Sequence, residues 1–312
     1  MKKVKTYIPI LLVLTVLISC ERDFDIALKD NEPQLIVEAY INNELPLFNY
    51  VILGNSQDYY SSGFENIPVT GATVTITEGT LLANNTYEWN TASKKTLREA
   101  RIPQLNNELL PGVYFDTTLV TNPAKALKGT PGKHYLLEIE TGGKHYSSIT
   151  ALLPIIPIDS LTSGNHFMDD DDDQEDNDDD TAVLKARITM HFKDPDTIGN
   201  TQLYYYRHAG NMRNFGWGGI GSNSFTPNTD DLVNGQYLHI THGKGFEMTD
   251  SVIYYMASVE RKVYNFWDSY NKARSNGGPF STPVKLLNTI SGENVIGCFS
   301  GFSISSRSII VK

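Results

Sequence analysis

The densest group of potential ligands in the sequence is an acidic run. Nine aspartates and one glutamate occupy the twelve residues 169–180. Carboxylate oxygens are the ligands that Ca²⁺ prefers, but calcium loops arrange them around a turning glycine, which this run lacks. Ten like charges repel one another and keep a segment solvated. We therefore expect a disordered acidic insertion. Weak Ca²⁺ binding would involve Asp169, Asp170, Asp171, Asp172 and Asp173.

A pair of histidines is the second candidate for metal chemistry. His239 and His242 lie three residues apart in NGQYLHITHGKGF, a spacing that could present both to a metal from one face of a helix. The surrounding residues predict a strand and a turn instead, where side chains three apart point to opposite sides. We do not expect these two histidines to share a metal, and the other five show no ligand spacing.

Cys20 stands at the end of a leader segment. Three lysines among the first five residues precede an apolar run from Tyr7 to Leu17, which is the arrangement of a secretory signal. The apolar run is shorter than the roughly 20 residues that a membrane-spanning helix needs. Residues 17–20, Leu-Ile-Ser-Cys, resemble the lipobox of bacterial lipoproteins.

The lipobox resemblance implies removal of residues 1–19 and lipidation of Cys20. A thiol suits this modification because its thiolate is the nucleophile that takes the lipid. Three acyl chains would then give lasting membrane attachment, whereas one chain holds only marginally. The alternatives are a plain signal peptide that ends beside a chance cysteine, or an uncleaved anchor. Residues 20–33 are poor in apolar side chains and predict a tether.

Charge and cysteine content exclude some classes of protein. The formal net charge is −10, or −13 without the three leader lysines, and most of it lies in the acidic run. With no basic stripe, we expect no nucleic-acid partner. Cys298 has no partner if Cys20 carries lipid, and its apolar surroundings, VIGCFSGF, predict a small buried hydrophobe.

No linear catalytic motif is present. The sequence lacks a G-x-S-x-G elbow, a P-loop and a dinucleotide fingerprint. A carboxylate pair for glycoside hydrolysis stays open, because its defining property is a separation in space. The glycine- and asparagine-rich segment 207–231 carries Phe215 and Trp217. These two aromatics could contact a ligand or partner, or could bury themselves under their own loop.

The part of the chain from residue 34 to 152 has the pattern of a β-sandwich. Alternation in residues 72–77 places Ala72, Val74 and Ile76 on one side and three threonines on the other, which predicts a sheet with one wet face. Gly142 and Gly143 predict a two-residue hairpin turn. Several short strands at this spacing favour an immunoglobulin- or transthyretin-like sandwich.

A second β-rich domain is expected from residue 159 to 312, after a proline-containing linker at 153–158. Residues 183–190 alternate and predict a strand. One long amphipathic helix is expected at about 250–275, capped by Thr249 or Asp250. Its apolar stripe would consist of Val252, Met256, Val259, Val263, Phe266 and Tyr270.

The chain resembles the Bacteroidetes lipoproteins grouped as domain of unknown function 4249. The resemblance rests on LIVEAYI, VTGATVTI, PIDSL, FKDP, the tyrosine-rich helix and, above all, the tail GPFSTPVKLLNTISGENVIGCFSGFS. The most specific positions in the tail are Phe280, Pro283, Asn288, Ile290, Gly297 and Phe299. The aspartate run departs from the family pattern. The resemblance implies an exported lipoprotein with a TonB-dependent outer-membrane receptor as partner.

These observations lead to an expected function and a rival. We expect an outer-membrane lipoprotein, held by its lipid anchor and displayed at the cell surface rather than on the periplasmic face. It would be a binding or assembly module accessory to a TonB-dependent receptor. The rival is a periplasmic or surface hydrolase that acts on glycan or peptide through carboxylates the sequence does not single out.

Overall fold

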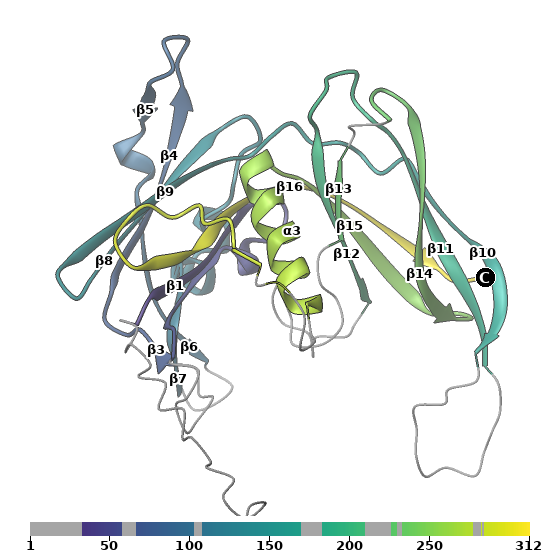
Figure 1. Cartoon of the computed structure of the whole chain (residues 1–312), viewed down its shortest axis with the longest axis horizontal. Coiled ribbons are helices and arrows are strands. Elements are labelled where there is room, and N and C mark those ends of the chain that lie inside the picture. Colours follow the sequence, from purple (N-terminus) through teal and green to yellow (C-terminus); the bar gives the residue numbers. More distant parts are fainter. Residues whose placement is uncertain are drawn as a thin grey trace, which may run out of the picture. The chain divides into compact units, whose positions relative to one another are not determined.

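The computed structural model shows a mainly β protein (Figure 1). It describes residues 33–57, 67–102, 108–169, 183–209, 226–229, 233–276, 282 and 284–312. The strands are β1 Leu35–Asn42, β2 Tyr50–Asn55, β3 Ile67–Pro68, β4 Thr73–Leu81, β5 Tyr87–Trp89, β6 Lys95–Ile102, β7 Glu108–Phe115, β8 His134–Thr141, β9 Lys144–Ala151, β10 Ser160–Asp169, β11 Val183–Lys193, β12 Thr201–His208, β13 Thr226–Thr229, β14 Tyr237–Glu247, β15 Ser251–Ser258 and β16 Val295–Ile310. The helices are η1 Pro46–Phe48, η2 Thr91–Ser93, α2 Thr118–Thr121, η4 Pro123–Lys125 and α3 Arg261–Ser275.

Most of the strands belong to one sheet. Its order is β13-β12-β15-β16-β1-β2-β7-β6-β4-β8-β9, with β3 on β2 and β5 on β4. The first and last strands of the described chain, β1 and β16, pair in parallel from Leu35 opposite Val295 to Asn42 opposite Phe302. The second half of β16 pairs with β15. The long strand β16 therefore pairs with the first described strand along one half and with β15 along the other.

Gly297 permits the β1–β16 pairing. A Cβ atom at this position would lie 1.9 Å from the carbonyl oxygen of Val37, and the glycine has a φ of +153°. Only glycine combines such a backbone angle with so close an approach. The Asn288 side chain braces the same region, because its Oδ1 accepts bonds from the amides of Ile290 and Gly297.

The β12-β15-β16 part of the sheet is covered on both faces. On one face, α3 contributes Val263, Phe266 and Trp267 to a core that includes Tyr255 and Phe302. On the other face lies a separate three-stranded sheet of order β10-β11-β14. Its inward side chains pack against alternate residues of β15, and this core includes Ile188, Met190, Phe192, Tyr254 and Met256. The three-layer arrangement explains why β15 is apolar on both sides.

The helix expected at about 250–275 is shorter than predicted. Residues 251–258 form strand β15, and α3 begins only at Arg261, with Glu260 at its N-cap position. The predicted cap at Thr249 or Asp250 is wrong. The spacing of Val252 and Met256 was misleading. β15 is buried on both faces, so its sequence lacks the alternation of apolar and polar residues that indicates a strand.

Other local predictions hold, with one correction. The alternation in β11 is confirmed, since Ala186, Ile188 and Met190 are fully buried. In β4, Val74 and Ile76 are buried as predicted, but the threonine face expected to be wet is not, because Thr75 and Thr77 are buried as well. β4 is an interior strand, paired with β6 and β8, and the Thr75 hydroxyl donates to the Glu138 carboxylate opposite it at 3.3 Å. Long side chains of the neighbouring strands therefore limit the exposure of this face.

The proposed boundary at 153–158 coincides with a segment without helix or strand. Ile156 and Ile158 of this segment are buried in the core beneath the three-stranded sheet. Residues 33–312 form one compact unit. The division into domains at 34–152 and 159–312 stays a prediction.

Substitution of Gly297 by alanine should severely destabilise the protein. We expect a loss of more than about 3 kcal/mol in the free energy of unfolding, because the new methyl group meets backbone that cannot yield. Urea denaturation monitored by tryptophan fluorescence measures this loss.

Gly132→Ala is the matched control for Gly297→Ala. Gly132 also has a positive φ, +84°, but an added Cβ there would meet no atom within 4 Å. It should cost only about 1 kcal/mol. Equal losses in the two variants would show that the need for glycine at position 297 comes from its backbone angle rather than from the close approach of β1.

Candidate functional site

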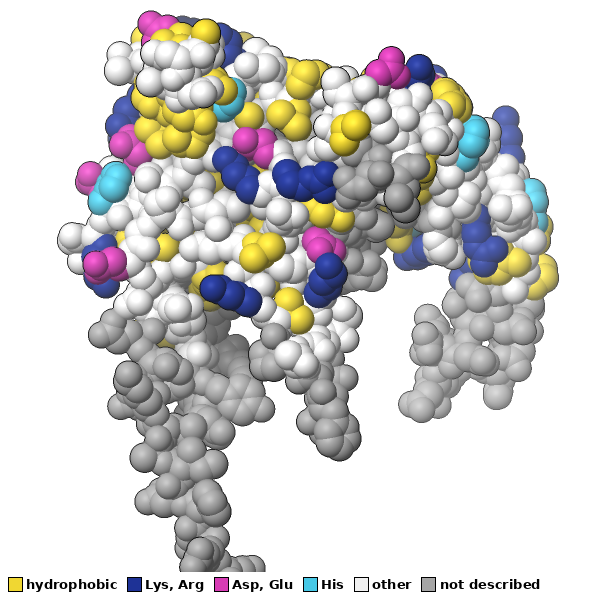
Figure 2. Space-filling view, turned by 45° about the horizontal axis from the view of Figure 1, so that its top comes forward, with side chains coloured by type: hydrophobic (Ala, Val, Ile, Leu, Met, Phe, Trp, Pro, Cys, Tyr) yellow, Lys and Arg dark blue, Asp and Glu magenta, His cyan; other side chains and the backbone are white. Residues whose placement is uncertain are grey.

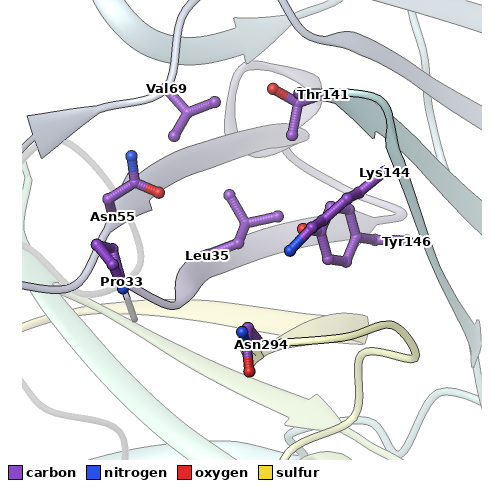
Figure 3. Close-up of a pocket in the computed structure, with 9 residues that line it drawn as sticks. Pro33, Leu35, Asn55, Val69, Thr141, Lys144, Tyr146 and Asn294 are labelled. Carbon is purple, nitrogen blue, oxygen red and sulfur yellow. The ribbon is translucent and has the colours of Figure 1, made fainter. Parts of the chain in front are cut away.

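An open pocket of about 260 Å³ lies where the described chain begins (Figure 3). It is lined by Pro33, Leu35, Asn55, Val69, Thr141, Gly142, Lys144, Tyr146 and Asn294. These residues come from the start of β1, the end of β2, the segment before β4, the β8–β9 hairpin and the turn before β16. Segments far apart in sequence therefore converge on one opening.

The β8–β9 hairpin forms one wall of the pocket. Gly142 and Gly143 have φ values of 56° and 73°, which suit the two-residue turn that was predicted from the Gly-Gly pair. The turn places Thr141 directly opposite Lys144. Lys144 and Tyr146 lie two residues apart in β9, so their side chains share a side of the strand, and Figure 3 shows both at the pocket wall.

The floor of the pocket is apolar. Leu35 and Tyr146 are each only 4% exposed and belong to the core between β1, β2, β4 and β8. Gly292 makes room for the Tyr146 ring, because a Cβ there would lie 2.3 Å from the ring. The Leu35 amide donates to the Asn294 carbonyl at 2.8 Å. The floor and the β16 turn are thus held together by packing and backbone bonds.

The rim of the pocket is polar. Asn55, Thr141 and Asn294 offer amide and hydroxyl groups, and Lys144 is the one charged side chain among the nine described lining residues. Such a set can hold a hydroxyl-rich or anionic group by hydrogen bonds and charge.

On the face of the molecule shown in Figure 2, acidic and basic side chains are interspersed.

Most of the site residues predicted from sequence lie outside the described part of the chain. These are Cys20, Phe215, Trp217 and the acidic residues 170–173. Asp169 ends strand β10, opposite Val183 in β11, and its side chain is not described. The lipid, partner-contact and Ca²⁺ predictions therefore remain predictions.

The structure places two other predicted residues. Cys298 is a buried thiol, 3% exposed, and burial raises its pKa to about 11. A thiol with a raised pKa is a poor nucleophile, so the prediction of a small buried hydrophobe is confirmed. His239 lies in β14 opposite His191 in β11. The side chain of His242 is not among those that the structure describes.

Sequence reasoning missed the pocket and the partner of His239. The Gly-Gly turn was a usable signal for one wall of the pocket, but no local pattern indicates that Asn55 and Asn294 lie beside it. His191 and His239 are 48 residues apart, and only the register of β11 against β14 brings them together.

Comparison with known proteins establishes the family. The protein is mainly β, and the model of the family described as Domain of unknown function (DUF4249) matches residues 21–308. The chain belongs to this family, and the resemblance inferred from sequence is confirmed. No curated protein matches the chain.

Two further findings apply to the described residues only. None of the helices among them is both long enough and apolar enough to cross a membrane. Within the same residues, no three or more side chains of histidine, cysteine, aspartate or glutamate gather into a group that could hold a metal ion.

Substitutions at the rim and at the floor of the pocket should differ in their effect on the stability of the protein. Lys144→Met should change the free energy of unfolding by less than about 0.5 kcal/mol, because the side chain is exposed at the rim. Tyr146→Ala should cost about 3 kcal/mol, because it removes a buried ring from the core. Chemical denaturation of both variants checks this. A large loss for Lys144→Met would instead place the lysine in the structural framework.

Proposed function

We propose that the protein is a lipid-anchored binding or assembly module of the outer membrane, accessory to a TonB-dependent receptor and displayed at the cell surface. The observation that carries the binding role is the convergence of four polar rim side chains over the apolar floor of one pocket. This composition, an apolar floor with a few placed polar groups, is typical of ligand sites.

Two features of the sequence support the anchored location. Residues 17–20 resemble a lipobox, and the family match begins at residue 21, directly after Cys20. A family match that starts directly after the cysteine is the arrangement expected of a processed lipoprotein. The lipid on Cys20 would hold the module at the membrane.

An exposed apolar hairpin supports the assembly role. The β4–β5 hairpin carries Leu81, Leu82 and Tyr87, which are 41%, 39% and 37% exposed. Tyr87 stacks on Trp89 with ring centroids 5.1 Å apart. Exposed aromatic and aliphatic side chains that gather in one place are typical of protein contact surfaces. We assign this hairpin to the receptor contact.

The finer architecture belongs to the same proposal. Strands β1, β2, β4, β6, β7, β8 and β9 contribute to one apolar core, to which Val295 and Phe299 of β16 also belong. The share that residues 34–152 have in this core supports an immunoglobulin- or transthyretin-like sandwich over these residues, with β16 added to it. Residues 159–312 would then form a second, β-rich domain with the helix α3.

The ligand is expected to be small, or to enter the pocket by one end. The volume of about 260 Å³ lies just below the roughly 300–1,000 Å³ typical of small-molecule sites. One terminal residue or functional group of a glycan or peptide fits this space. Lys144 would select for an acidic group on that end.

The Cys20→Ala variant tests the anchored, receptor-bound state. Tagged wild-type protein and Cys20→Ala should be purified from cross-linked outer membranes, and the co-purifying proteins identified by mass spectrometry. We expect the wild type to partition into detergent and to bring down a TonB-dependent receptor. The variant, which lacks the thiol that takes the lipid, should do neither.

Two outcomes would contradict different parts of the proposal. Unchanged detergent partitioning of Cys20→Ala would refute lipidation at this residue. Anchored protein that repeatedly recovers no receptor would refute the accessory role and would favour a free-standing binder or the rival hydrolase. Leu82→Ser, on the exposed hairpin, should weaken receptor recovery without changing detergent partitioning.

A further inference from the structure

Two histidines meet on the outer face of the three-stranded sheet. His191 in β11 and His239 in β14 are directly opposite each other, and their Nδ1 atoms lie 2.6 Å apart. The ring centroids are 4.8 Å apart, with an interplanar angle of 72°. His239 is exposed and His191 is half-buried. The opposite face of β11 is buried in the core, so the strand cannot rotate to separate the pair.

The protons of the pair are constrained by a third residue. The Nε2 atom of His191 lies 2.8 Å from the hydroxyl oxygen of Thr162 in β10. When Nε2–H donates to this hydroxyl, Nδ1 of neutral His191 carries a lone pair. His239 then donates its own Nδ1–H across the 2.6 Å gap. The gap therefore holds a single proton between two nitrogens, both of which can ligate a metal.

We propose that His191 and His239 together bind a divalent first-row transition-metal ion, of the class of Zn²⁺, Ni²⁺ and Cu²⁺, through their two Nδ1 atoms. The metal takes the place of the shared proton, and His239 changes tautomer: as its Nδ1 proton leaves to water, its Nε2 takes a proton from water, so both imidazoles ligate as neutral groups with no net release of a proton. Imidazole nitrogen suits these metals, whereas Ca²⁺ and Mg²⁺ prefer oxygen. With bonds of about 2.0–2.1 Å, tetrahedral coordination separates the two nitrogens by roughly 3.3 Å. Rotation of the exposed His239 side chain supplies the difference.

The neighbouring groups fit this role. The Thr162 hydroxyl fixes the orientation of His191, as outer-shell partners of metal-bound histidines do. The Tyr237 ring lies 5.3 Å from the His239 ring, and the Asp159 amide donates to the His191 carbonyl at 2.9 Å. Lys193 lies opposite Tyr237, and its positive charge would repel a metal cation. This ammonium is paired with the Asp196 carboxylate at 3.7 Å, which offsets part of the repulsion. Water completes the coordination, because the face is open.

The surroundings of His191 favour its neutral form, which is the form that binds a metal. Burial, followed by the repulsion of His239, lowers the pKa of His191 below its ordinary value of 6.5. His191 is therefore neutral and able to bind a metal at neutral pH.

The experiment is a titration of the full chain, in detergent and without a histidine tag, with ZnSO₄ and then NiCl₂. Selective labelling of histidine gives one set of side-chain resonances for each of the seven histidines. The resonances of His191 and His239 should respond first. Isothermal titration should show at least a tenfold loss of Zn²⁺ affinity in His191→Gln and in His239→Gln, and a smaller loss in Thr162→Val.

His166→Gln is the matched control, because His166 lies in β10 of the same sheet and bonds only the carbonyl of Lys312 among the contacts described. Its Zn²⁺ affinity should stay within twofold of the wild type. The proposal is overturned if His191 and His239 do not respond in the wild-type spectra, or if the double variant binds Zn²⁺ within twofold of the wild type. The wild-type spectra decide the question even if a variant fails to fold.

Discussion

The parallel pairing of β1 and β16 is the constraint on which the rest of the fold depends. It joins residues about 260 positions apart, a closure whose entropic cost must be offset by the contacts it creates. Gly297 removes the side chain that would block the approach, and Asn288 fixes the preceding turn. Because β16 continues beyond β1 to pair with β15, the same strand carries the helix layer and the three-stranded sheet.

Whether a strand is buried on one face or on both decided whether its type could be predicted from the sequence. β11 has one buried face, so its alternation was readable, and the Gly142–Gly143 turn was readable from local backbone preference alone. β15 has the helix α3 over one face and β10-β11-β14 over the other. An apolar run without a polar face fits a buried strand and a buried helix equally well, and only the tertiary structure distinguishes them.

The same limit applies to the sites. The pocket needs Asn55, Lys144 and Asn294, which lie on three elements whose order in the sheet is not encoded in any local pattern. Likewise, spacing in the sequence offered only His242 as a neighbour of His239, and that pair was not expected to share a metal, whereas the register of two strands places His191 beside His239. A linear motif can reveal a site only when its residues share one element. Neither of these sites is of that kind, since each depends on strand register.

The position of the pocket limits how far it could lie from the proposed lipid anchor. Pro33 lines the pocket and lies thirteen positions after Cys20. A fully extended chain of that length spans at most about 45 Å. If Cys20 carries the lipid, the pocket mouth stays within that distance of the bilayer, close to any receptor embedded there. A captured ligand would then be held at high effective concentration beside the receptor, so a modest intrinsic affinity suffices for an accessory role.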